Sequence, residues 1–269
     1  MSIFKIFNLL SFDVAISSLG TAYLASIVTH TSPLLLWWIL VPTFTFLAFN
    51  ADHLFDVVFH NNAALSYRYQ FHVRYRNELF IVVLFISLIL LTVLFFISPN
   101  LFFLAIFGAL AFFCHMLLLH FKLFSFTKEL RVALIYTGVI WAYPVILNTT
   151  VSIDAILNAF LLFIGICLIN LYTLSYLDYG LDMTSGFDGI NSILSKRYIR
   201  ILSFVLGVCL NVYILFFSKL WYSLKLSFLS MSFLLTIAVI LKESFLKCYY
   251  RKISEWVFLL PFFIFIFFF

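Results

Sequence analysis

Charged residues are scarce in this chain of 269 residues. Asp, Glu, Lys and Arg together make up 10% of it, whereas hydrophobic residues make up 65%. Soluble domains carry about 25% charged and about 45–50% apolar residues. A fold surrounded by water cannot hide this much apolar surface, so the composition excludes a soluble enzyme, a nucleic-acid-binding domain and a disordered chain. The sequence predicts an integral membrane protein without a nucleic-acid partner.

Cysteines are also few, and none of the four stands at Cys-x-x-Cys spacing. Cys114, Cys167 and Cys209 lie inside apolar runs. We interpret all four cysteines, Cys248 included, as small buried core residues. The alternating segments of about 10 residues that form a lipid-facing barrel are missing as well. Apolar runs of about 20 residues indicate membrane-spanning helices instead.

Apolar runs between polar breaks predict nine transmembrane helices in a single domain over residues 1–269. Several breaks carry turn residues, such as Ser98-Pro99-Asn100 and Asn148-Thr149-Thr150. The expected spans are roughly 9–29, 34–59, 79–98, 101–121, 130–148, 152–177, 200–217, 221–241 and 254–269.

The distribution of basic residues predicts the orientation. With the N-terminus in the cytoplasm, fourteen of the sixteen Lys and Arg residues fall on the cytoplasmic side, all except Lys219 and Lys225. Because basic residues accumulate in cytoplasmic loops, we expect the N-terminus inside and the C-terminus outside. The net charge of +5 is therefore interpreted as a topology signal.

Two pairs of aspartates stand out near the cytoplasmic ends of the second and sixth predicted spans. Asp52 and Asp56 form one Asp-x-x-x-Asp pair, and Asp178 and Asp182 form the other. Residues four apart share a face of a helix, so each helix presents two carboxylates together. The matching placement predicts two pseudo-repeated four-helix halves, each with one pair, followed by a ninth helix.

Four converging carboxylates require a cation, and a hard divalent ion such as Mg²⁺ suits oxygen ligands and substrate phosphates. Basic residues are expected at the same membrane level, namely Arg68, Lys128 and Arg131. Arginine forks and lysine charges bind phosphate oxygens. Carboxylates, Mg²⁺ and basic groups together predict a site that binds and ionises a diphosphate.

With these motifs, the sequence resembles the UbiA-type intramembrane prenyltransferases. The resemblance rests on residues 50–56 (Asn-Ala-Asp-His-Leu-Phe-Asp), on residues 176–186 around the second pair, and on the stretch from Lys128 to Pro144. The first family motif usually reads Asn-x-x-x-Asp-x-x-x-Asp. Aligned on Asp56, this chain has Asp52 at the Asn position and His60 at the last Asp position, so it departs from the pattern.

The resemblance implies Mg²⁺-dependent transfer of an isoprenyl group from a prenyl diphosphate to an aromatic or other lipid-soluble acceptor. It implies a site facing the cytoplasm, in the cytoplasmic membrane of a bacterium, with membrane lipids around the chain. The implied metal ligands are Asp52, Asp56, Asp178 and Asp182, the catalytic residues Asp56, Asp178 and Asp182, and the diphosphate-binding residues Arg68, Lys128 and Arg131.

Two other interpretations stay open at this point. The incomplete first motif is compatible with a non-catalytic membrane scaffold of the same architecture that binds a lipid or a protein partner. A transporter with an acidic cation site is the third interpretation, because carboxylates at the ends of spans also mark ion pathways.

Overall fold

The computed structural model describes residues 7–59, 67–185, 189–218, 220–241 and 243–268. Within these residues the chain contains helices and turns and no strand. Two 3₁₀-helices, η1 (Ser125–Thr127) and η2 (Ile190–Ser192), precede α7 and α9. The α-helices are α2 (Phe12–Val28), α3 (Leu35–Phe59), α4 (Tyr67–Arg74), α5 (Arg76–Ile97), α6 (Pro99–His120), α7 (Lys128–Leu147), α8 (Ile153–Ser185), α9 (Lys196–Phe216), α10 (Tyr222–Ile240) and α11 (Glu243–Phe268).

Within the described residues, seven helices are long and apolar enough to cross a membrane, namely α3 and α5 to α10. α2 is apolar but has 17 residues. The outer helix α5 shows how the bundle meets its surroundings: of its 22 residues, Leu79 and Leu94 are the buried ones, while Phe80, Ile81 and Phe85 are exposed. An apolar helix of this kind is stable against lipid and not against water. The chain is therefore an all-α polytopic membrane protein, as predicted.

The predicted spans lie on the observed helices, with differences at the polar ends. α8 continues to Ser185, whereas the predicted span stopped at residue 177, and α11 starts at Glu243 instead of residue 254. The eight-residue α4 was not predicted. Reading apolar runs finds the part of a helix that lies in lipid, and it misses turns that continue into water with a polar face.

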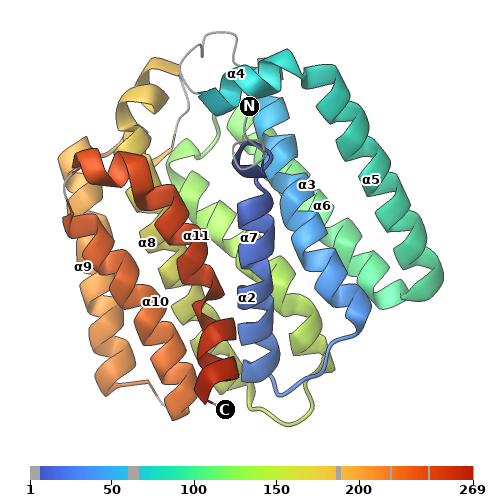
Figure 1. Cartoon of the computed structure of the whole chain (residues 1–269), viewed down its shortest axis with the longest axis vertical. Coiled ribbons are helices and arrows are strands. Elements are labelled where there is room, and N and C mark those ends of the chain that lie inside the picture. Colours follow the sequence, from blue (N-terminus) through green and yellow to red (C-terminus); the bar gives the residue numbers. More distant parts are fainter. Residues whose placement is uncertain (1–6, 60–66, 186–188, 219, 242, 269) are drawn as a thin grey trace.

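The helices form a closed bundle in which sequence neighbours pack side by side, and α11 closes the bundle against α2 (Figure 1). Gly20 permits the α2–α11 contact, because a Cβ atom there would collide with the backbone carbonyl of Phe258. Small residues let membrane helices approach closely. α3 packs against α2, α5 and α6, and α8 packs against α7, α9 and α10.

Candidate functional site

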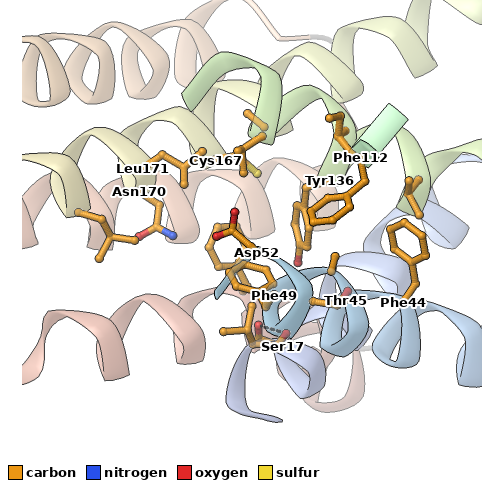
Figure 2. Close-up of a pocket in the computed structure, with 18 of the residues that line it drawn as sticks. Ser17, Phe44, Thr45, Phe49, Asp52, Phe112, Tyr136, Cys167, Asn170 and Leu171 are labelled. Carbon is orange, nitrogen blue, oxygen red and sulfur yellow. Dashed lines mark hydrogen bonds between the residues drawn. The ribbon is translucent and has the colours of Figure 1, made fainter. Parts of the chain in front are cut away.

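A cavity of about 190 Å³ lies inside the bundle. Its lining comes from α2, α3, α4, α6, α7, α8 and α11, and from Asn8 before α2. In Figure 2, Asp52 and Asn170 lie towards one end of the cavity, and Phe44 and Phe112 lie towards the other. The cavity therefore joins a polar end to an apolar end.

Five charged side chains line the cavity: Asp13 from α2, Glu255 from α11, and three of the predicted site residues. Asp52 comes from α3, Arg68 from α4, and Lys128 from the first turn of α7; we call them the charged mouth. The positive charge of Lys128 acts on the Asp52 carboxylate. From the opposite wall, the amide of Asn170 on α8 points towards Asp52 (Figure 2). The structure thus brings together three of the residues predicted from sequence.

Arg68 is held in place by the segment before α2. Its Nη2 donates to the backbone oxygen of Asn8 at 2.7 Å and to the Asn8 Oδ1 at 3.4 Å. The Asn8 side-chain amide in turn donates to the Asp13 carboxylate. This chain of hydrogen bonds fixes a guanidinium at the cavity, which is the group that proteins use to bind phosphate oxygens.

Asp52, His53 and Asp56 form a half-buried cluster in which one potential ligand atom from each lies within 4.8 Å of the others. Carboxylate oxygens fit Mg²⁺ and Mn²⁺, whereas the imidazole is a ligand that suits ions such as Zn²⁺ and Fe²⁺. Within the described residues, this is the one group of three or more His, Cys, Asp and Glu side chains that is able to hold a metal ion. Sequence analysis did not assign His53 to the metal site. Residues three apart are neighbours on the surface of a helix, so the spacing of His53 and Asp56 was a signal that could have identified it.

The second aspartate pair, on α8, differs from the first in its position relative to the cavity. Asn170 lines the cavity, whereas the half-buried Asp178, like Asp56 of the first pair, is outside its lining. Eight residues turn an α-helix about 80° beyond two full turns, so Asn170 and Asp178 share a face only approximately. The side chain of Asp182 and the whole of His60 lie outside the described residues.

Arg131, a predicted diphosphate ligand, directs its guanidinium towards the turn before α7. Nη1 donates to the Phe124 carbonyl oxygen at 2.8 Å and to Thr127 Oγ1 at 2.7 Å. Nε donates to Nδ1 of His115 at 3.2 Å, and His115 lines the cavity whereas Arg131 does not. In this structure Arg131 positions the α6–α7 connection, and its role in diphosphate binding stays a prediction.

Glu255 brings a carboxylate from α11 that sequence analysis did not assign to the site. It lines the cavity, and the Ser17 hydroxyl of α2 donates to its Oε2 at 3.1 Å. Carboxylates between membrane helices are costly unless they face a cavity or a polar partner. Ser17 and Glu255 are 238 residues apart, so no local pattern in the sequence connects them.

His72 on α4 supports the charged mouth from behind. Its Nδ1 donates to the backbone oxygen of Arg68 at 2.9 Å, and its ring lies 4.9 Å from that of His53. Burial lowers the pKa of His72, as does the nearby charge of Arg68, while the hydrogen bond to the Arg68 backbone opposes the shift. The net effect is a pKa of His72 below its usual value.

No protein-family model, curated protein or solved structure matches the chain. The class is consequently defined by the fold and the cavity: an all-α polytopic membrane protein with an internal cavity that is charged at one end and apolar at the other.

Proposed function

We propose that the chain is a UbiA-like prenyltransferase that moves an isoprenyl group from a prenyl diphosphate to an aromatic or other lipid-soluble acceptor. The observation that carries the proposal is the continuity between the charged mouth and the apolar part of one cavity. An amphipathic substrate has a matching arrangement, with an anionic head for the charged mouth and a hydrocarbon tail for the apolar part. Ligand cavities of this kind use a few placed polar groups to orient a mostly apolar ligand.

In the proposed reaction the bond between the first prenyl carbon and the diphosphate oxygen breaks, and the electron pair leaves with the diphosphate. The acceptor then forms the new bond to that carbon and loses a proton. Lys128 and Arg68 bind the diphosphate and stabilise the charge that it gains. Mg²⁺, when bound by Asp52 and Asp56, would supply further neutralisation of that charge. In this proposal Asp178 and Asp182 complete the metal and catalytic site from α8.

The proposal includes nine spans, with α2 and α11 added to the seven helices that are long and apolar enough to cross a membrane. It also includes two pseudo-repeated halves. The contacts of α3 with α2, α5 and α6 correspond in chain order to those of α8 with α7, α9 and α10, which supports the repeat. We place the charged mouth on the cytoplasmic side of a bacterial cytoplasmic membrane, because basic residues gather at that end.

A non-catalytic scaffold that binds a lipid or a protein partner is the second candidate. One observation favours it: Lys128 already provides a positive charge for Asp52, so the mouth is partly neutralised without a metal ion. Buried pairs of a carboxylate and a lysine also occur as structural elements of proteins, so the Asp52–Lys128 pair does not require a bound ligand.

Diphosphate release from purified protein in detergent distinguishes the two. With Mg²⁺, a panel of prenyl diphosphates and a panel of aromatic acceptors, the enzyme should release diphosphate, and EDTA should abolish release. Asp56→Asn, Asp178→Asn and Asp182→Asn should each lower the rate by about 100-fold, the scale of one lost preorganised electrostatic group. Asp154→Asn is the matched control, because Asp154 is an exposed carboxylate in the first turn of α8. Absence of release with every donor would favour the scaffold.

A further inference from the structure

The apolar end of the cavity is lined by half-buried aromatic and aliphatic side chains. Phe44 of α3, Phe112 of α6 and Val139 of α7 line this part of the cavity, and we call them the apolar floor. Figure 2 shows Phe44 and Phe112 close together at the end away from Asn170. Phe44 precedes Asp52 by eight residues on α3, which corresponds to about 12 Å along the helix axis. The distance between mouth and floor is therefore set by the backbone of one helix.

Gly108 of α6 stands directly behind this floor. A Cβ atom at Gly108 would lie 3.1 Å from Cγ2 of Val139 and 3.2 Å from Cζ of Phe44. Both distances are shorter than ordinary van der Waals contact, so any side chain at position 108 must displace these two residues. Close-packed interiors transmit such displacements to their neighbours instead of absorbing them. The displaced Phe44 and Val139 side chains border the cavity, so the space available to a ligand changes with the residue at position 108.

We propose that Gly108, Phe44 and Val139 form a length gauge that restricts the cavity to short isoprenyl tails, of dimethylallyl to geranyl size, and excludes farnesyl and longer chains. The inference rests on the proposed function and names its substrate class. The cavity volume of about 190 Å³ is close to the roughly 150 Å³ of an engineered protein cavity that accepts a benzene-sized ligand. A farnesyl or longer chain is larger than this volume and would have to extend past the apolar floor.

A second glycine offers a matched control. Gly138 lies on α7 next to Val139, and a Cβ atom added there would meet nothing within 4 Å. Gly108→Ala and Gly138→Ala therefore make the same chemical change inside a membrane helix. Only the methyl group of Gly108→Ala would displace side chains of the apolar floor.

The test measures binding of dimethylallyl, geranyl and farnesyl diphosphates to the full chain in detergent with Mg²⁺, by calorimetry. The wild type should bind geranyl diphosphate at least about tenfold more tightly than farnesyl diphosphate, the scale set by extra carbons that a pocket rejects. Gly108→Ala should shift the preference further towards dimethylallyl diphosphate. Phe44→Ala, which removes the ring, should relax or reverse it, and Gly138→Ala should leave it unchanged.

Two outcomes overturn the gauge. One is wild-type protein that binds farnesyl diphosphate as tightly as geranyl diphosphate. The other is an unchanged length preference in both Gly108→Ala and Phe44→Ala. Geraniol and farnesol, which lack the diphosphate, separate the gauge from the proposed function. If the alcohols show the length preference while no diphosphate is transferred, the prenyltransferase proposal fails and the gauge stands. If transfer occurs without length preference, the gauge fails and the prenyltransferase stands.

Discussion

Glu129 of α7 receives the backbone N–H of Ile190 at both carboxylate oxygens, at 3.2 and 3.1 Å. The Ser175 hydroxyl of α8 donates to the same carboxylate at 2.8 Å, and Glu129 is 5% exposed. Gly189 makes room for it, since a Cβ atom there would lie 2.6 Å from Oε1. One buried carboxylate next to Lys128 thus ties α7 to α8 and to η2, which follows the second aspartate pair.

Replacement of Glu129 by alanine should destabilise the protein. The Ile190 N–H and the Ser175 hydroxyl would lose their acceptor in a buried place, at a cost of about 1–3 kcal/mol. Thermal unfolding in detergent should show a lower Tm for Glu129→Ala and an intermediate Tm for Glu129→Gln, which keeps one acceptor oxygen. Asp154→Ala, at an exposed position of α8, should unfold like the wild type. A wild-type Tm in Glu129→Ala would contradict the anchoring role.

Acid should destabilise the region around α4. Because burial lowers the pKa of His72 in the folded protein, the unfolded chain binds a proton more readily. The stability contribution is present above the unfolded value of about 6.5 and is lost as the pH falls from there towards the lower folded pKa. The Tm of the wild type should therefore decrease from pH 7.5 to pH 5, and His72→Gln should show a smaller decrease.

The matched control for this pH series is His30→Gln, since His30 is an exposed histidine outside α4. It should retain the pH dependence of the wild type. Equal pH dependence in His72→Gln and His30→Gln would show that His72 is not the group responsible.

The positions of the helices were predictable from sequence, because long apolar runs have one stable form in lipid. The predicted span 221–241 and the observed α10 (Tyr222–Ile240) illustrate the agreement. Asp52, Lys128 and Arg68 all line one cavity in the structure, since the topology puts their helix ends on one side. Glu255 and Ser17 were not predictable in this way. Their contact depends on how α11 closes against α2, which no local spacing encodes.

The nine-span topology makes an independent prediction. Reporter fusions after Asn100, Thr150 and Phe269 should all be located outside, because an odd number of spans separates each of them from a cytoplasmic N-terminus. The basic residues favour this orientation, because a cytoplasmic N-terminus would put fourteen of the sixteen on the inner side. A fusion after Arg200 serves as the cytoplasmic control. A cytoplasmic signal at Phe269 would mean that α2 or α11 does not cross the membrane, and would reduce the count of spans.

Lys128 and Arg131, both predicted to bind a diphosphate, should respond differently to substitution. Lys128 lines the cavity, whereas the Arg131 guanidinium binds Phe124 and Thr127 in the preceding turn. Lys128→Gln should weaken geranyl diphosphate binding about tenfold or more, since hydrogen bonds to charged groups contribute roughly 1.5–3 kcal/mol. The affinity is measured on the folded fraction, because Lys128→Gln also removes the positive charge that acts on Asp52.

Arg131→Lys should give the opposite result, a lower Tm with nearly unchanged affinity in the folded fraction. Lysine keeps the charge but has a single nitrogen, so it cannot donate to His115, as Nε does, while it also reaches Phe124 and Thr127, as Nη1 does. Calorimetry and thermal unfolding on the same preparations separate the two effects, with Lys252→Gln as the control at an exposed cation. If Arg131→Lys instead loses affinity as strongly as Lys128→Gln at an unchanged Tm, Arg131 turns towards the ligand on binding. The diphosphate site would then extend from α7 into the α6–α7 connection.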